Sequence, residues 1–211
     1  MILGIIGTEP SARAIMPYAE AAAAVELSET VEAVFVSPDN TTTGLDGKRC
    51  LSFDDYLQMD PAGTRFALAV TDTYEREALA NRLSEAGFSP ASLRHETWGA
   101  LPGVSIGEGD LFGQFVAITT RQTIGRYFQA FAYSYVAHDC AVGDFVTLGA
   151  RACCNGNVIV GNHVTIGMGA MIMPGRPNKP VMIGDGAIIG MGAIVTGDVP
   201  AGATVKGNPA S

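Results

Sequence analysis

Residues 136–172 read VAHDCAVGDFVTLGARACCNGNVIVGNHVTIGMGAMI, and this stretch decides the fold. Every sixth residue in it, which we call the guide residue, is apolar: Val136, Val142, Leu148, Cys154, Val160, Ile166 and Ile172. The same spacing extends back to Ile106 and, after five extra residues, forward through Ile183 to Val195. Twelve guide positions in unbroken register between residues 106 and 172 indicate a repeat architecture.

The six-residue repeat predicts a triangular solenoid, in which each of three repeats supplies one short strand to one side of a coil. Guide residues then point inward and stack on the guide residue 18 positions later, as Val136 does on Cys154. Glycine often follows the guide residue, where a tight corner needs a positive φ or a close approach. The five extra residues, near 176–180, must leave the solenoid either as a plain surface loop or as an arm that reaches a ligand groove.

The first hundred residues follow a different pattern, in which short apolar runs alternate with helical segments. Residues 2–6, 32–36 and 66–70 are the predicted strands. One helix begins at about Ser11 and is disturbed at Pro17, and another is capped by Asp72, runs to about Ala86 and ends at Gly87. This alternation predicts a small parallel α/β sheet, so we expect an α/β domain over residues 1–100 and an all-β solenoid domain over residues 101–211.

Charge and composition exclude several classes of partner. The net charge is −8, which argues against nucleic acid, because such binding depends on Lys and Arg neutralising phosphates. No apolar stretch approaches the roughly 20 residues of a membrane helix, and Met1 to Ile6 have neither the basic region nor the cleavage site of a signal peptide. The four cysteines have no metal or disulfide spacing, so we expect reduced thiols in a cytoplasmic protein.

The histidines are the natural candidates for chemistry, and there are three: His95, His138 and His163. A zinc site of three histidines within one chain is not expected, because His138 and His163 fall on different faces and His95 precedes the solenoid. His138 stands two residues after guide residue Val136, at a corner, and should point outward. A neutral imidazole there can take a proton, with Asp139 orienting the ring; the alternative is a plain surface His–Asp pair.

The sequence as a whole resembles the bacterial sugar acetyltransferases of the sialic-acid O-acetyltransferase and bacillosamine N-acetyltransferase type. The motifs that carry the resemblance lie in residues 136–145, 156–161 and 205–210. Members of this family join a small Rossmann-like domain to a left-handed parallel β-helix. The resemblance implies that His138 is the general base and that Asp139 raises its basicity. It also implies a homotrimer that binds acetyl-CoA in a groove between two chains, lined by Gly156, Met168 and Met191.

The resemblance also implies that the N-terminal domain holds a nucleotide-linked sugar. In the family a glycine-rich turn with a histidine follows the first strand and grips the phosphates. Here that turn carries Glu9, which adds negative charge, and Pro10, which lacks an N–H. We expect the acceptor to be bound by residues after the first and second strands: Pro10, Ser11, Ala12, Ser37 and Asp39.

The function that follows from these observations is acetyl transfer from acetyl-CoA, as a co-substrate, to the amino group of a nucleotide-linked sugar in bacterial surface-glycan biosynthesis. The expected partners are therefore a small sugar acceptor, acetyl-CoA and two further copies of the chain, without a metal. Two alternatives stay open: O-acetylation of a sialic-acid-like sugar, and a non-catalytic trimeric binding scaffold. Hydrolysis of metal-activated substrates is a more distant alternative. The sequence names neither the sugar nor the nucleotide.

Overall fold

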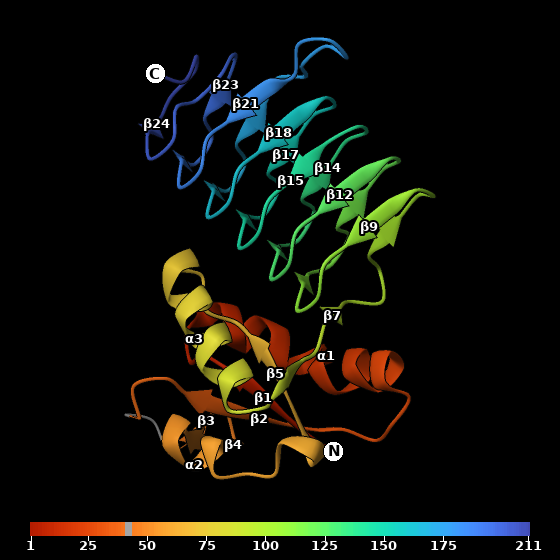
Figure 1. The fold of residues 1–211 in the computed structure, drawn as a ribbon, viewed down its shortest axis with the longest axis vertical. Coiled ribbons are helices and arrows are strands. Elements are labelled where there is room, and N and C mark those ends of the chain that lie inside the picture. The colour runs from red at the N-terminus through yellow and green to blue at the C-terminus, as the bar shows by residue number, and fades with distance from the viewer. Residues whose placement is uncertain (41–43) are drawn as a thin grey trace. The chain divides into compact units, whose positions relative to one another are not determined.

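The computed structural model describes residues 1–40 and 44–211, and these form two compact units (Figure 1). The first unit contains Met1–Arg94 together with Glu108–Leu111. The second contains His95–Gly107 and Phe112–Ser211. The chain therefore changes from one unit to the other at residue 94, crosses back briefly at 108–111, and then stays in the second unit.

The first unit is built on a six-stranded sheet in which β1 (Ile2–Ile6) is central. The strand order is β3 (Gly44–Leu45), β4 (Lys48–Ser52), β2 (Glu32–Ser37), β1, β5 (Thr64–Leu68) and β6 (Ser89–Pro90). All pairs are parallel except β3 with β4. Ile5 lies opposite both Phe35 and Ala67, and all three are buried, as expected for a parallel sheet covered on both faces.

In the described residues of this unit, three helices and one 3₁₀ turn complete the fold: α1 (Pro10–Leu27), α2 (Phe53–Leu57), η1 (Pro61–Gly63) and α3 (Thr73–Glu85). The predicted start of α3 is confirmed, because the Asp72 carboxylate accepts hydrogen bonds from the backbone N–H groups of Tyr74 and Glu75. Its predicted end is confirmed too, since Gly87 has a φ of 89° just past the helix. No helix in the described part of the chain is long and apolar enough to cross a membrane.

Several predictions for this unit were wrong in detail. Helix α1 begins at Pro10, close to the predicted start at about Ser11, but it continues unbroken through Pro17, where a disturbance was predicted. Pro17 is solvent-exposed, so water can satisfy the carbonyl that loses its partner. Strand β5 lies two residues earlier than predicted, because its pairing with β1 sets its ends. The short elements β4 and α2 were not predicted, since five residues carry too little periodicity.

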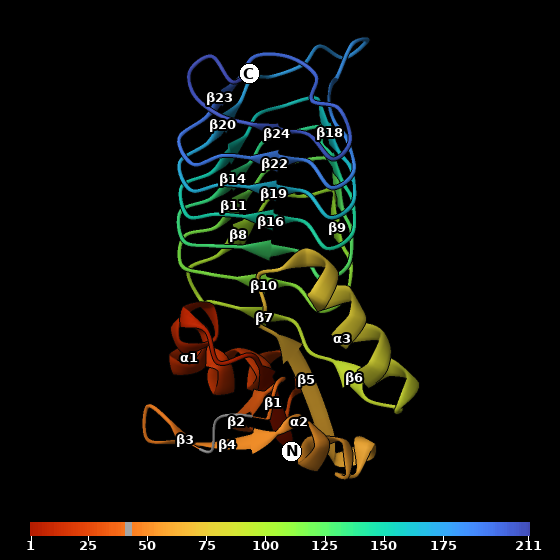
Figure 2. The same ribbon diagram turned by 90° about the vertical axis from the view of Figure 1, so that its left-hand side faces the viewer.

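The second unit is a parallel β-helix with three sheets. One sheet contains β24 (Thr204–Val205), β22 (Ile188–Ile189), β19 (Thr165–Ile166), β16 (Thr147–Leu148), β13 (Gln129–Ala130) and β10 (Leu111–Phe112). The next contains β23 (Ile194–Val195), β20 (Met171–Ile172), β17 (Cys153–Cys154), β14 (Tyr135–Val136), β11 (Ala117–Ile118) and β8 (Gly99–Ala100). The third contains β21 (Val181–Ile183), β18 (Val158–Val160), β15 (Ala141–Val142), β12 (Gln122–Ile124) and β9 (Val104–Ile106). Figure 2 shows β16, β19 and β22 stacked one above another.

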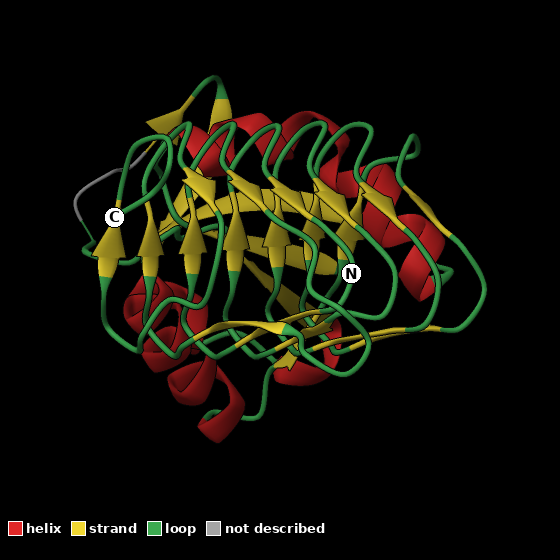
Figure 3. Ribbon diagram, turned by 90° about the horizontal axis from the view of Figure 1, so that it is seen from above, coloured by secondary structure: helices red, strands yellow, loops and turns green. Residues whose placement is uncertain are grey.

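The predicted register is confirmed. Val136 pairs with Cys154, and Cys154 pairs with Ile172, always in parallel. Val160 pairs with Ile183, so the five extra residues are absorbed between β20 and β21 without a shift of the guide positions. Figure 3, seen from above, shows the strands of one sheet side by side and pointing the same way.

Guide residues form the core of the solenoid. Those from Phe112 to Val195 are buried, while Ile106 in the first coils is half-buried. The residues two positions before them are buried as well, which gives one continuous apolar column along the axis: Cys140, Val146, Ala152, Val158, Val164 and Ala170. Each buried aliphatic guide side chain stabilises the fold by about 1.5–3 kcal/mol.

The glycines that follow the guide residues are needed because the backbone of the next coil lies against them, and not because they adopt a positive φ. A Cβ at Gly149 would lie 2.6 Å from the backbone nitrogen of Met168, and one at Gly167 would lie 2.7 Å from that of Met191. The positive φ falls two residues further on, and side chains accept it there: Phe115, Arg121, Tyr127, Tyr133, Asp139, Phe145, Arg151, Asn157 and His163. Each corner can therefore present a functional side chain in the left-handed conformation.

One corner of the solenoid is occupied by stacked aromatic rings and by hydrogen bonds between side chains and backbone. The rings of Tyr127, Phe145 and His163 stack with centroid separations of 5.1 and 5.3 Å. Beside them, the side-chain oxygen of Asp144 accepts from Arg126 N at 2.9 Å, and that of Asn162 accepts from Asp144 N at 2.8 Å. His163 belongs to this stack, which lies at a different corner from His138.

Candidate active site

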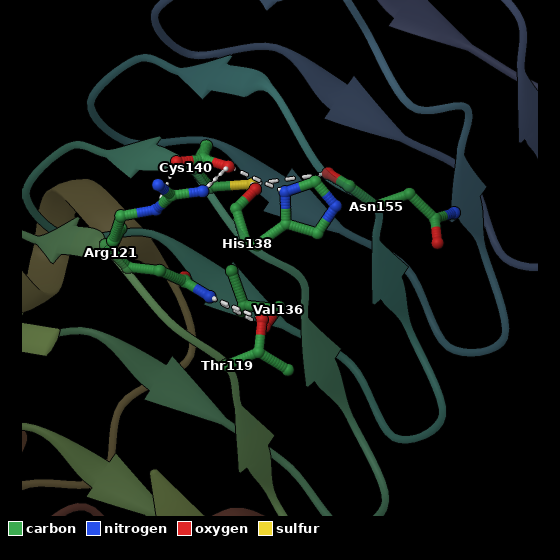
Figure 4. A network of polar contacts seen from close by, with 8 residues as sticks. Thr119, Arg121, Val136, His138, Cys140 and Asn155 are labelled. Carbon is green, nitrogen blue, oxygen red and sulfur yellow. Dashed lines mark hydrogen bonds and ion pairs between the residues drawn. The ribbon is translucent and has the colours of Figure 1, made fainter. Parts of the chain in front are cut away.

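His138 lies on the turn between β14 and β15, and backbone hydrogen bonds to the coils on both sides hold this turn. Ala137 N donates to Cys154 O at 2.8 Å, and Asn157 N donates to His138 O at 3.0 Å. On the other side, Asp139 N donates to Thr120 O at 3.2 Å. The backbone under the imidazole is thus fixed, while the side chain itself is 54% exposed (Figure 4).

The predicted contact between His138 and Asp139 is present. The Nδ1 atom of His138 lies 2.8 Å from Oδ2 of Asp139. Asp139 adopts a φ of 57°, and this left-handed conformation lets its carboxylate meet the ring of the preceding residue. When Nδ1 carries the proton and donates it to the carboxylate, Nε2 keeps a lone pair that can accept a proton.

Arg121 completes this group and was missed by sequence reasoning. Its Nε lies 2.9 Å from Oδ1 of Asp139, and a second guanidinium nitrogen donates to Oδ2 at 3.2 Å (Figure 4). The hydrogen bond from His138 and the charge of Arg121 lower the pKa of the Asp139 carboxyl, so the carboxylate is ionised at neutral pH. The spacing of 18 residues places Arg121 at the same corner one coil before Asp139, but spacing alone does not show where its side chain points.

Gly156 lies against the imidazole. A Cβ on Gly156 would lie 2.6 Å from Cε1 and 2.7 Å from Nε2 of His138, which is too close for either ring atom. The ring therefore occupies the space that any other residue at 156 would fill. Gly156 stands 18 residues, or one coil, after His138, which agrees with this contact. The role of Gly156 toward acetyl-CoA stays a prediction.

Buried polar groups beneath the corner support the same turn. The amide of Gln122 donates to Val136 O at 2.8 Å, and the thiol of Cys140 donates to Asn155 O at 3.2 Å (Figure 4). The hydrogen bond with Cys154 lowers the pKa of the Cys140 thiol. These contacts hold the backbone on either side of His138.

Met168 and Met191 occupy a different corner of the same solenoid. Gly192 N donates to Met168 O at 2.9 Å, so the two methionines lie on successive coils. The two residues are 55% and 72% exposed. Within one chain the structure does not bring them to His138, because one full side of the triangle separates the two corners.

The predicted acceptor residues gather at the carboxyl ends of β1, β2 and β5 in the first unit. Ser11 Oγ donates to Ala69 O at 2.6 Å, just past β5. Ser37 is fully buried, and its hydroxyl donates to the exposed carboxylate of Asp39 at 2.6 Å. Pro10 is exposed as the first residue of α1, whereas Ala12 is fully buried and can offer only backbone groups to a ligand.

Side chains that could bind a metal ion do not cluster in residues 1–40 and 44–211. Within these ranges, no group of three or more His, Cys, Asp or Glu side chains could hold such an ion. The chemistry that the corner can perform with its own residues is the acceptance of a proton by His138.

Known proteins resemble the chain over its whole length, although no family model matches it. GDP-perosamine N-acetyltransferase of Escherichia coli O157:H7 is 38% identical over 209 residues, which cover 99% of this chain and 95% of that protein. The structure of WeeI from Acinetobacter baumannii AYE superposes with a TM-score of 0.92 at 36% identity, covering 100% of this chain and 99% of that one. A histidine-to-asparagine mutant of perosamine N-acetyltransferase from Caulobacter crescentus, in complex with CoA and GDP-perosamine, gives a TM-score of 0.85 at 29% identity, covering 100% and 96%.

Proposed function

The chain belongs to the bacterial sugar N-acetyltransferases of the hexapeptide-repeat family, and we propose that its acceptor is a GDP-linked amino sugar such as GDP-perosamine. The enzyme transfers the acetyl group of acetyl-CoA to the amino group of a nucleotide-linked sugar, in the assembly of bacterial surface glycans. The hydrogen-bonded pair of His138 and Asp139 at an exposed corner of the solenoid carries the assignment of acetyl transfer, and the likeness to GDP-perosamine N-acetyltransferases supports the GDP-linked acceptor. This pair argues against a non-catalytic scaffold.

The chemistry of the corner fits direct transfer. The sugar amine attacks the carbonyl carbon of the thioester while Nε2 of His138 takes the proton that the nitrogen loses. Asp139 stabilises the imidazolium through Nδ1, and Arg121 keeps Asp139 ionised. The C–S bond then breaks, and the CoA thiolate can recover the proton from His138, which restores the neutral base.

We assign acceptor binding to the first unit and regard it as a Rossmann-like nucleotide-sugar domain. Ligands of open parallel sheets bind at the carboxyl ends of the strands, where Ser11, Ser37 and Asp39 lie. The hydroxyl of Ser37 holds the carboxylate of Asp39, which is then placed to accept hydrogen bonds from the base or the ribose. Pro10 and the backbone of Ala12 lie at the start of α1, whose partial positive charge favours the diphosphate, while Glu9 at the N-cap adds a negative charge that opposes it.

Thermal unfolding tests the identity of the acceptor. With CoA present, GDP-perosamine should stabilise the protein by about 2.7 kcal/mol at a hundredfold excess over its Kd, because it binds only the folded state. The UDP-linked amino sugar should shift the unfolding temperature less. Asp39→Ala should reduce the shift by GDP-perosamine, whereas Glu85→Gln, at an exposed position on α3, should keep it. A larger shift with the UDP sugar would overturn the assignment.

We propose a homotrimer in which the His138 corner of one chain faces the Met168 and Met191 corner of the next. The support is that the two corners cannot meet within one chain, although both are expected to line the acetyl-CoA groove. We place the enzyme in the cytoplasm, since its four cysteines are free thiols. Light scattering at micromolar concentration should give three times the chain mass of 21.9 kDa. A mass of one chain would rule out a groove between chains.

A further inference from the structure

The five extra residues form a closed hairpin rather than an open loop. Arg176 N donates to Lys179 O at 2.9 Å, and Lys179 N donates to Arg176 O at 2.9 Å. This reciprocal pair closes a two-residue turn of Pro177 and Asn178. The hairpin projects from the solenoid beside β21 (Figure 1). Its two cationic residues are therefore held at the base of a tight turn, and both are exposed.

This hairpin leaves the solenoid at the same corner as His138. Gly175 N donates to Gly156 O at 2.9 Å, and Val181 N donates to Asn157 O at 3.2 Å. Gly156 in turn lies against the ring of His138. Neighbouring coils are spaced like neighbouring strands, so the base of the hairpin lies about 10 Å along the axis from His138.

The charges of the hairpin are not used within the solenoid. Arg121 and Arg126 each form an ion pair with an aspartate one coil later. Across the described residues, no such partner is found for Arg176 or Lys179. Two cations without an ion-pair partner among the described residues, on a chain of net charge −8, make this corner favourable for an anionic ligand.

Exposed apolar side chains lie beside this corner, both on the coil after His138 and on the coil of the hairpin. Ile159 and Met182 lie on adjacent strands just after the corner and are 38% and 44% exposed. Met173 precedes the corner on the coil of the hairpin and is 49% exposed. From the coil of His138 to the coil of the hairpin, this edge thus carries a base, then the exposed Ile159, and then two cations flanked by Met173 and Met182.

We propose that Arg176 and Lys179 bind the phosphate groups of acetyl-CoA. This rests on the proposed function, in which the thioester lies at His138. The order of groups along acetyl-CoA is a thioester, a largely uncharged pantetheine arm and then the phosphates, which matches the order of groups along the corner. The ligand extends toward the C-terminal coils, and the hairpin receives its charged end.

The double variant Arg176→Gln with Lys179→Gln tests the proposal in the full-length enzyme. The KM for acetyl-CoA should rise about tenfold, while kcat at saturating acetyl-CoA should hold, because the charges contact a part of the ligand that does not react. The rise should disappear with S-acetylpantetheine, which lacks the phosphates. The swapped variant Arg176→Lys with Lys179→Arg should retain most of the affinity, because it keeps both charges.

The kinetic results of these variants distinguish the phosphates of acetyl-CoA from the diphosphate of the nucleotide sugar. A rise in the KM for the nucleotide sugar instead of acetyl-CoA would show that the hairpin serves the acceptor diphosphate, and would overturn the proposal. An equal loss with S-acetylpantetheine, or no loss at all, would overturn it too. Calorimetry with CoA alone measures the loss of affinity without turnover, so a failure of acetyl transfer by the unmodified enzyme would refute only the proposed function.

Discussion

Replacing His138 with alanine is expected to lower kcat by about 10²–10⁴-fold, because the attacking amine loses the group that takes its proton. The corner turn should survive, since its backbone hydrogen bonds do not involve the imidazole. CoA affinity and the mass of the oligomer should therefore remain close to those of the unmodified protein. Steady-state kinetics, calorimetry with CoA and light scattering measure the three quantities.

A pair of aspartates provides the matched control. Asp139 and Asp144 are both corner residues in an ion pair with an arginine one coil earlier, but only Asp139 contacts His138. Asp139→Asn should lower kcat by less than His138→Ala does, and Asp144→Asn should leave it almost unchanged. An unaltered kcat in a correctly folded His138→Ala protein would remove His138 from the mechanism.

The substitution Gly156→Ala is expected to lower kcat by about 10²-fold, since a displacement of a catalytic group by about 1 Å can cost that much. The new methyl group would occupy the position of the His138 ring, which is the flexible end of a side chain and can swing away. The fold should hold, because a side chain can move where backbone cannot. Kinetics together with circular dichroism would separate the two effects.

Gly197 supplies the control for this substitution. It occupies the equivalent place relative to guide residue Val195, and a Cβ there would meet nothing within 4 Å. Gly197→Ala should thus leave kcat unchanged. If Gly156→Ala proved as active as Gly197→Ala, the observed orientation of the imidazole would be irrelevant to catalysis.

The solenoid could be predicted from sequence because each guide residue repeats the same physical requirement. Val136, Cys154 and Ile172 are apolar for one reason, namely burial in a shared column, so twelve weak signals reinforce one another. His138 could be placed at a corner by counting from Val136, and Asp139 followed from adjacency. Gly156 could be placed beside His138 because the two residues are 18 positions, or one coil, apart.

Other features could not be obtained in this way. Arg121 was missed because side chains at a corner can leave in several directions, and only the structure shows its guanidinium on Asp139. The positive φ of Asp139 was also hidden, since glycine was expected to take that conformation. In the first unit each element occurs once, so local errors at Pro17 and β5 were not corrected by a repeat.

The most direct test of transfer to an amine by His138 is the product formed by unmodified enzyme and His138→Ala side by side. Each is incubated with acetyl-CoA and GDP-perosamine, and the acetylated nucleotide sugar is treated with hydroxylamine, which cleaves esters but leaves amides. The expected result is one hydroxylamine-stable acetyl group for each CoA released by the unmodified enzyme, and only a trace of product from His138→Ala. A hydroxylamine-labile ester, or equal amounts of amide from both proteins, would contradict it.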